Sequence, residues 1–573
     1  MTFTHPFMQE RAMGSVHRID GSTTGITLPN AAGIVRSQFG QRVPRGEIGE
    51  FVVIDVGGFG VFGRLVEIST NPREIPKNGH ELSGNDQLGT TGHIQLLATL
   101  HLDGRYERGI RRYPRIGDHA YSASDEVLSA IVAGVSGDGL SNRELMIDLG
   151  ILSSGGSIPV QISASKLFGR HLAILGATGG GKSWTLAHIA EEVAAKNGKM
   201  IVIDATGEFS TLGSIAKHVS LGSKIDSPEE SVLACMPHYT FSEADRNAFF
   251  RPSGASQLPK LRAAVKSLRL AEVLGVSTGL VNEDGIVVKT GKLRKEYIEP
   301  SILNVNIVEN PYSKFSLRNL PVQISHECIY DHDRSNQNQF GSWANNEIGY
   351  CNTLISRIHD MIETPALMDV VERDDDIPEV MTLLEDWIKN GTQSIFRLSL
   401  RNLPFTHYLR EIIVNSIGRR LLDLGRSGTF LESPLVVAID EAHQFFGQTI
   451  GDELASSALD SFDSIAKEGR KYGLTVCMAT QRPRDLPSGV LSQAGMLIVH
   501  RLADRRDRDH VEGAASDVDQ SAAKLLPSLI PGEALMVGAD FPVPLPVRIT
   551  PPLRRPTSDG PSYSTGWTSV TVS

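Results

Sequence analysis

Eight consecutive residues have the types and the spacing needed to hold a triphosphate. They are Gly176, Ala177, Thr178, Gly179, Gly180, Gly181, Lys182 and Ser183, and they fit the pattern G-x-x-x-x-G-K-[ST]. Glycines allow consecutive backbone N–H groups to turn toward one phosphate, and a helix that starts there adds its dipole. The lysine of this pattern reaches the β- and γ-phosphate oxygens, and the hydroxyl binds Mg²⁺. We therefore predict a nucleotide site at 176–184, including Trp184, with Lys182 as a catalytic cation and Ser183 as a metal ligand.

Two adjacent acids indicate what happens to the triphosphate. The run PLVVAIDEAHQFF is an apolar strand that ends in Asp440 and Glu441. An aspartate there holds Mg²⁺ through water, and a following glutamate orients the attacking water as a general base. A second acid of this kind favours hydrolysis of ATP by water over transfer to a small acceptor. We therefore predict Asp440 as a metal ligand and Glu441 as the catalytic base.

Two polar positions follow this acidic strand. Gln481 ends the strand-like run LTVCMATQ, where a side chain can contact the γ-phosphate or the attacking water. Arg470 lies in the turn before that run and has two possible roles. It is either a solvated cation at a helix end or an arginine finger that reaches a neighbouring subunit's site.

The letters DEAH also invite comparison with the DEAH-box helicases. In those helicases the acidic strand follows the phosphate loop much more closely than Asp440 follows Lys182 here. No later Q-x-x-GR-x-GR motif is present either. We therefore assign His443 a local hydrogen-bonding role.

These side chains need a buried parallel sheet to position them. From about Phe168, continuous apolar runs alternate with helical periods, which indicates an α/β fold. We expect its two parts at 166–213 and 395–552, with a mainly helical subdomain inserted at 214–394. Residues 1–165 contain short alternating runs and a Gly-rich hairpin, typical of a small β-barrel. The segment 553–573 is rich in Pro, Ser and Gly, a composition that predicts a flexible or docking tail.

Composition narrows the class of protein. The chain has 573 residues, of which 40% are hydrophobic and 21% charged, as in soluble globular proteins. It shows no signal peptide and no apolar run long enough to cross a bilayer. The four cysteines are scattered without a CxxC pair, which argues against a zinc site and fits a cytoplasmic location. A net charge of −10 restricts nucleic-acid binding to a local groove or pore.

Five segments in order resemble the motifs of the HerA family of hexameric DNA-translocating ATPases, relatives of FtsK. They are GRHLAILGATGGGKS, VIDATGEF, VVAIDEAHQFF, AKEGRKYGLTVCMATQRP and LSQAGMLIVHRLADRRD. The N-terminal region looks, more weakly, like the small barrel of that family, called the HAS barrel. The resemblance implies a RecA-like P-loop ATPase core, and it finds no motif within 214–394.

The resemblance also assigns roles by position. Gln481 resembles the family's sensor and Arg470 its trans-acting arginine. Arg170 matches a second arginine at the ATP site between subunits. Asp204 and Glu208 match the acidic end of the second core strand, where they would position water or stabilise the loop.

The function implied is an ATP- and Mg²⁺-dependent ring, a homo-hexamer that moves double-stranded DNA through a central pore. By resemblance, such rings work in bacteria with a separate nuclease or NAD-consuming effector, in DNA end processing or anti-phage defence, without a membrane. The loop at 446–453 is a candidate pore element, although a plain surface loop explains it equally well. Two alternatives stay open: an ATP-dependent scaffold for an effector with little translocation, and a conjugation-type DNA pump.

Overall fold

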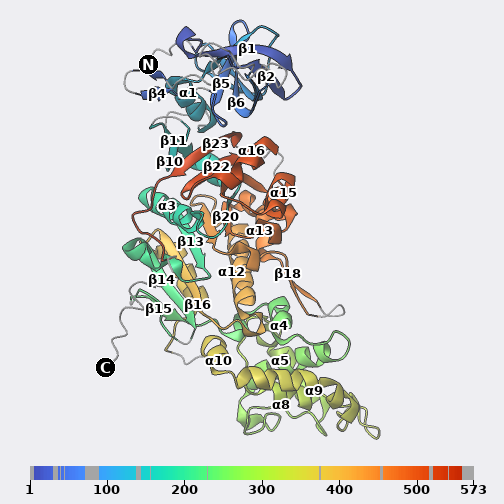
Figure 1. Ribbon diagram of the computed structural model, residues 1–573. Coiled ribbons are helices and arrows are strands. Elements are labelled where there is room, and N and C mark those ends of the chain that lie inside the picture. The colour runs from blue at the N-terminus through green and yellow to red at the C-terminus, as the bar shows by residue number, and fades with distance from the viewer. Residues whose placement is uncertain are drawn as a thin grey trace, which may run out of the picture. The chain divides into compact units, whose positions relative to one another are not determined.

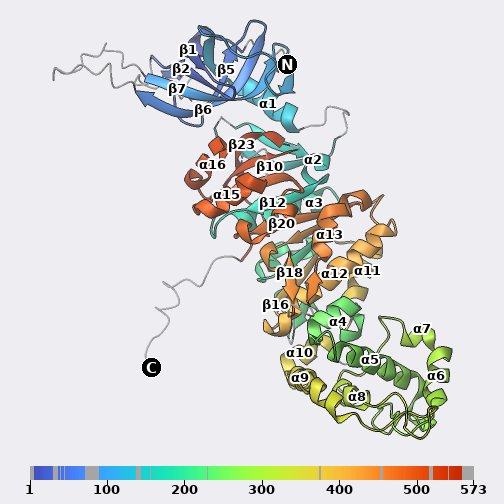
Figure 2. The same cartoon turned by 90° about the vertical axis from the view of Figure 1, so that its right-hand side faces the viewer.

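The computed structural model describes most of the chain. The described residues are 6–29, 36–38, 41–43, 46–70, 90–136, 144–154, 157–222, 224–228, 230–372, 376–451, 456–514, 520–539 and 541–557. The chain forms two units (Figures 1 and 2). One comprises Met1–Glu192 and Ala479–Leu553, and the other comprises Val193–Met478 and Arg554–Ser573.

The first unit begins with a closed antiparallel barrel. Its strands are β1 (Ala12–Ile19), β2 (Thr23–Thr27), β5 (Phe51–Asp55), β6 (Phe59–Thr70), β7 (Thr90–His101) and β9 (His119–Ser122). They pair in the order β2-β1-β9-β5-β6-β7, and β7 pairs back with β2, which closes the sheet. The strand β8 (Tyr106–Arg108) is added beside β7. The predicted small barrel is therefore confirmed.

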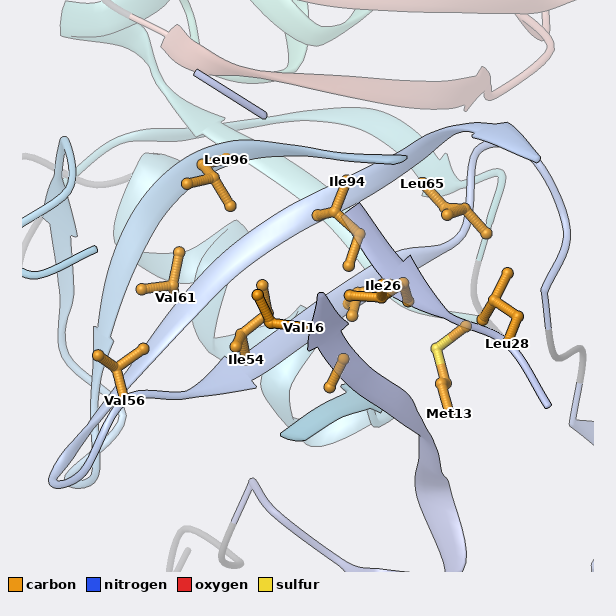
Figure 3. Packing of buried hydrophobic residues seen from close by; sticks show 12 residues of the cluster. Met13, Val16, Ile26, Leu28, Ile54, Val56, Val61, Leu65, Ile94 and Leu96 are labelled. Carbon is orange, nitrogen blue, oxygen red and sulfur yellow. The ribbon is translucent and has the colours of Figure 1, made fainter. Parts of the chain in front are cut away.

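The barrel is filled by alternate side chains of its strands. Figure 3 shows Val16, Ile26, Ile54 and Ile94 directed into one cluster from different strands. Each of these side chains is at most 1% exposed. The period of two in β5 and β7 therefore contributes to the core, since every second residue of a strand faces the same side, whereas β1 has an irregular register and places Met13 and Val16 there.

A second sheet in the first unit carries the phosphate loop. Its strands are β10 (Met146–Leu152), β11 (Pro159–Ser163), β12 (His171–Leu175), β21 (Ala494–His500), β22 (Glu533–Gly538) and β23 (Phe541–Ile549). Their order is β11-β10-β23-β22-β21-β12, with β12 parallel to β21. The helix α1 (Asp125–Ser136) separates β10 from the barrel strands in the sequence. The strands β10 and β11, which we had placed with the barrel in 1–165, thus pair in this other sheet.

The second unit contains parallel strands with the acidic motifs at their ends. They are β13 (Lys199–Asp204), β14 (Ala216–Gly222), β15 (Val232–Ala234), β16 (Ile395–Asn402), β17 (Leu435–Ile439) and β20 (Leu474–Thr480), whose last two residues belong to the first unit. Their order is β20-β17-β13-β16-β14-β15, and each neighbouring pair in this order is parallel. This confirms the predicted α/β core.

The segment predicted as a mainly helical insertion starts with sheet. The strands β14 and β15 fall within 214–394 but pair alongside β16. Helices follow: α4 (Glu243–Phe250), α5 (Gln257–Leu274), α6 (Arg294–Leu303), α7 (Val305–Val308), α8 (Leu320–His326), α9 (Asn345–Ile362), α10 (Pro365–Val371) and α11 (Val380–Asn390). Figure 2 shows α5, α8 and α9 packed as one helical group. The strand β14 was not predicted, because the polar residues His218 and Ser220 interrupt its apolar pattern. Both residues are nevertheless buried.

Candidate nucleotide site

The phosphate loop lies between β12 and the helix α3 (Lys182–Ala195). All five residues of β12 are buried, as its apolar sequence predicts. The backbone takes positive φ at Gly179 (74°) and Gly181 (113°), which side chains with a Cβ rarely adopt. A Cβ on Gly176 would lie 2.6 Å from the Cβ of His500. The glycines are therefore required by the shape of the loop, and Lys182, at 8% exposed, begins the helix beneath it.

The structure brings Gln481 to this loop. The Thr178 hydroxyl donates a hydrogen bond to Oε1 of Gln481 over 2.5 Å. The N–H of Gly176 donates to the carbonyl oxygen of Thr480 over 3.3 Å. Because Oε1 accepts from Thr178, the amide Nε2 of Gln481 is oriented as a donor, which suits contact with a phosphate oxygen or water.

Sequence reasoning missed His500, which supports the loop from below. Its Nδ1 lies 2.8 Å from the carbonyl oxygen of Glu533, and its Nε2 lies 2.8 Å from the hydroxyl of Thr185. A carbonyl oxygen only accepts, so Nδ1 carries the proton and Nε2 accepts from Thr185. Burial, with a smaller contribution from Lys182, lowers the pKa of His500 to about 4. The imidazole is therefore neutral at physiological pH and acts as a rigid support.

The predicted acids meet at one edge of the second unit's sheet. The strands β13 and β17 are parallel neighbours, so Asp204 and Asp440 both follow the carboxyl ends of their strands. The Asp204 carboxylate accepts hydrogen bonds from the N–H groups of Gly207, Glu208 and Phe209 over 2.8, 3.1 and 3.0 Å. The Thr206 hydroxyl in the same turn donates to Oδ2 of Asp440 over 3.3 Å. Asp204 thus shapes the turn that touches the predicted metal ligand.

The surroundings of Asp440 favour a bound cation. Burial raises the pKa of this carboxyl well above its ordinary value, and the charges of Asp204, Glu441 and Glu208 raise it further. A divalent ion would neutralise that repulsion. Oε2 of Glu208 is buried without a hydrogen-bond partner among the described residues, so the cluster has acceptor capacity left over. A carboxylate oxygen is among the donors that suit Mg²⁺, so these surroundings agree with the prediction of Asp440 as a metal ligand.

Glu441 is held in a strained backbone conformation. Its φ and ψ are 48° and 46°, in the left-handed region, immediately before the short 3-10 helix Ala442–Gln444. Its Oε2 lies 3.4 Å from Nδ1 of His443, with both side chains mostly buried. Strain of this kind persists where the surrounding structure fixes a residue, often at active sites. The conformation of Glu441 agrees with its predicted role as a base, and that role and the hydrogen-bonding role of His443 stay predictions.

A second residue that sequence reasoning missed is Arg397, at the centre of β16. Its side chain is fully buried, and its Nε donates to Oδ2 of Asp204 over 2.7 Å. Its Nη2 donates to Oδ2 of Asp226 over 2.9 Å. Burial acts to raise the pKa of Asp226, but hydrogen bonds from Ser399 and Arg397 lower it overall. Arg397 therefore compensates two buried carboxylates, one of which shapes the turn beside Asp440.

The remaining predicted residues lie on the surfaces of their units. Arg470 is exposed in the 3-10 turn Gly469–Tyr472, before β20, and Arg170 is exposed just before β12. Trp184 is partly buried in the first turn of α3. Within the predicted loop 446–453, Phe446 is buried and β18 (Gln448–Ile450) pairs with β19 (Ser457–Leu459), whereas 452 and 453 lie outside the described residues. Residues 558–573 of the predicted tail also lie outside them.

Two kinds of feature are absent from the described ranges. They contain no helix long and apolar enough to cross a membrane. They also contain no group of three or more His, Cys, Asp and Glu side chains arranged to hold a metal ion.

The chain is similar to proteins of known families. Residues 147–300 match the domain described as "Helicase HerA, central domain", and residues 423–550 match "Helicase HerA-like C-terminal". A protein of Pyrococcus furiosus named DNA double-strand break repair helicase HerA is 22% identical over 482 residues, covering 83% of this chain and 80% of that protein. A Saccharolobus solfataricus protein of the same name is 25% identical over 446 residues, covering 76% and 73%.

Solved structures were also matched. Plasmid coupling protein TrwB, in complex with an ATP analogue that cannot be hydrolysed, is 12% identical with a TM-score of 0.41, covering 77% of this chain and 94% of that one. VirB4 of Thermoanaerobacter pseudethanolicus is 14% identical with a TM-score of 0.39, covering 72% and 98%.

Replacing His500 tests its role as the support of the phosphate loop. We expect His500→Ala to weaken binding of an ATP analogue by about tenfold, because the cavity and the unpaired Thr185 and Glu533 groups loosen the loop. The rise in melting temperature on adding nucleotide should shrink accordingly. His238 is a matched control, since it is equally buried with a pKa also near 4 but lies away from the loop. His238→Ala should lower the melting temperature without changing nucleotide affinity. Equal affinity in His500→Ala and wild type would contradict the assignment.

Neutralising Asp440 should separate stability from activity. The folded-state pKa of Asp440 is raised above its ordinary value of 3.8. The carboxyl group therefore stabilises the fold while it is protonated, and this stabilisation is lost as the pH rises through the folded-state pKa. Asp440→Asn should therefore raise the melting temperature of the nucleotide-free protein at neutral pH while abolishing Mg²⁺-dependent ATP hydrolysis. Asp204→Asn should do the opposite to stability, because the buried Arg397 then keeps only one of its two charged partners, Asp226. A lower melting temperature in Asp440→Asn would contradict this account.

Proposed function

The chain belongs to the HerA family of helicases, and from this premise we propose that it is an ATP-driven motor that moves double-stranded DNA. It is an ATP-hydrolysing enzyme of the helicase type. The observation that carries the proposal is the glycine-built phosphate loop of the first unit, with Gln481 hydrogen-bonded to it. The second unit carries a strained Glu441 next to the buried Asp440. Each unit thus supplies one part of what hydrolysis of a triphosphate by water requires.

Each predicted residue has a task in that reaction. The backbone N–H groups of 176–181 and Lys182 bind and orient the phosphates. Ser183 and Asp440 are the residues that would hold Mg²⁺, which when bound would withdraw charge from the γ-phosphate. Glu441 accepts the proton of the attacking water, and its fixed backbone limits the directions from which that water can approach. Gln481 orients the same water or a γ-phosphate oxygen.

We propose that the sites are completed across subunits of a ring, a homo-hexamer. Arg470 and Arg170 are exposed at the surfaces of their own units, where they are accessible to a neighbouring copy. A guanidinium from the next subunit would stabilise the charge that develops on the transferred phosphoryl group. This explains why ATP hydrolysis in such an assembly would depend on contact between copies.

We also propose the biological setting. The relatives in Pyrococcus furiosus and Saccharolobus solfataricus are named for DNA double-strand break repair. Work at DNA ends, in end processing or anti-phage defence, fits a motor that acts together with a separate nuclease or NAD-consuming effector in the cytoplasm. Stimulation of ATP hydrolysis by linear duplex DNA is the experiment that tests the motor, since a scaffold that uses ATP only for assembly would show none.

Two substitutions separate binding from hydrolysis. Lys182→Ala should abolish binding of ATP, because the phosphates lose their only loop cation. Glu441→Gln should bind ATP with normal affinity but hydrolyse it at least about 10²-fold more slowly, since the water loses its base. Titration calorimetry and phosphate release measure the two quantities. Normal turnover in Glu441→Gln would contradict the assignment of the base.

Mixed rings test the role of Arg470. Arg470→Ala should bind ATP normally but hydrolyse it about 10³-fold or more slowly. Mixing inactive Arg470→Ala subunits with inactive Glu441→Gln subunits should restore part of the activity, because some interfaces then combine an intact glutamate with an intact arginine. Lys471→Ala, a change of the neighbouring exposed cation, should have little effect. If mixing restores nothing, Arg470 does not act in trans.

A further inference from the structure

The loop that follows β16, residues 405–408, combines strain with exposed aromatic rings. His407 and Tyr408 have φ of 58° and 55°, and Arg251, which touches this loop, has φ of 51°. Nη2 of Arg251 lies 3.3 Å from Nδ1 of His407, and its guanidinium lies 6.0 Å from the ring centre of Tyr408. Three of the five non-glycine residues with positive φ in the described chain therefore meet at one place. The surrounding structure maintains a costly conformation there.

The strained backbone presents two rings to solvent. Phe405 is 78% exposed, more than any other aromatic side chain of the described residues, and Tyr408 is 47% exposed. The Arg410 guanidinium covers one face of the Phe405 ring, 3.7 Å from the ring centre. An aromatic side chain held in this way is fixed in position and still offers its outer face to a ligand.

The charges around the loop are mainly positive. Arg251 and Arg357 both lower the pKa of His407, after the larger effect of burial, whereas Asp360 is the acid that opposes them. Glu411, the other nearby carboxylate, has a raised pKa because it is buried. Guanidinium groups beside exposed rings are the combination that contacts phosphate and sugar or stacks on bases.

The loop is connected to the acidic turn of the candidate nucleotide site. The strands β13, β16 and β17 are parallel, so the loops after them lie at the same edge of the sheet. Nη1 of Arg410 donates to the carbonyl oxygen of Ala205 over 3.4 Å, and Nη2 donates to that of Leu403 over 2.9 Å. Ala205 lies between Asp204 and Thr206, whose hydroxyl donates to Asp440. One buried guanidinium therefore bridges the exposed ring of Phe405 and the turn beside the metal ligand.

We propose that residues 405–408 form a DNA-contacting surface, in which Phe405 and Tyr408 pack on the sugar-phosphate backbone and Arg251 pairs with a phosphate. Arg410 is a positioning residue that couples this surface to the turn at 204–209. The inference rests on the proposed function, because a duplex is the partner it names. It assigns the contact to the loop after β16, and not to the loop at 446–453, where Phe446 and Ile450 are buried.

The experiment measures binding of a fluorescent blunt-ended duplex by anisotropy, with Mg²⁺ and an ATP analogue that cannot be hydrolysed. The double variant Phe405→Ala, Tyr408→Ala should bind at least about tenfold more weakly than wild type. Arg251→Gln should lower the slope of log affinity against log salt by about one. Tyr330→Ala, Tyr350→Ala is the matched control, since these rings are 56% and 63% exposed elsewhere in the same unit, and it should bind like wild type. The size of the assembly, measured by light scattering, should be unchanged in all of them.

The outcomes distinguish the proposals. If wild type binds no duplex, the proposed function fails. If wild type binds and the Phe405→Ala, Tyr408→Ala variant binds equally well, only the loop assignment fails. If that variant loses its assembly instead of its affinity, the surface is a contact between copies, which also overturns the assignment.

A second readout tests the coupling through Arg410. Arg410→Lys keeps the positive charge under Phe405 but cannot bridge the carbonyl oxygens of Leu403 and Ala205 together. It should keep duplex affinity within about twofold of wild type and reduce the factor by which DNA stimulates ATP hydrolysis. A merely structural role would change stability and leave that factor unaltered. An unchanged stimulation factor would overturn the coupling role.

Discussion

Arg397 and Asp204 form a fully buried ion pair on adjacent parallel strands, with Nε and Oδ2 separated by 2.7 Å. Removing Arg397 would cost about 3–5 kcal/mol, because the charge of Asp204 would stay buried without its arginine. The Asp204 carboxylate also accepts hydrogen bonds from the N–H groups of Gly207, Glu208 and Phe209. The shape of that turn, and through it the contacts of Thr206 with Asp440 and of Ala205 with Arg410, depends on this one interaction.

The same interaction explains how a buried sheet edge tolerates several acids. Burial raises the pKa of Asp440, and repulsion by Asp204, Glu441 and Glu208 raises it further. Arg397 compensates Asp204, and the described residues give it no ion pair with Asp440. Asp440, which this arginine leaves uncompensated, is the carboxylate assigned to the metal. The repulsion is therefore concentrated at the point where a bound cation would relieve it.

The local motifs could be predicted from sequence, and the long-range ones could not. The phosphate loop, the pair Asp440 and Glu441, and Gln481 each sit at the end of an apolar strand, so their spacing along the chain fixes their chemistry. His500 and Arg397 act through residues far from them in sequence, and a histidine or arginine within a strand carries no signal of that role. The strand β14 was missed because His218 and Ser220 look exposed in a pattern, yet they face the buried Arg397 network. The strands β10 and β11 were assigned to the barrel because alternation identifies a strand's buried face and not its partner.

The acidic composition of the chain gives the loop after β16 its significance. With a net charge of −10, long-range attraction cannot hold the protein on DNA, so affinity must come from a few well-placed groups. A strained, fixed loop suits that requirement, because rigid aromatic rings and preset guanidinium groups lose little conformational freedom on binding. Its attachment to the turn at 204–209 by Arg410 has a further consequence. The carbonyl oxygen of Ala205, to which Arg410 donates, belongs to the turn whose Thr206 donates to Asp440. A hydrogen-bonded path of this kind is what the proposed coupling of ATP hydrolysis to movement of duplex DNA requires.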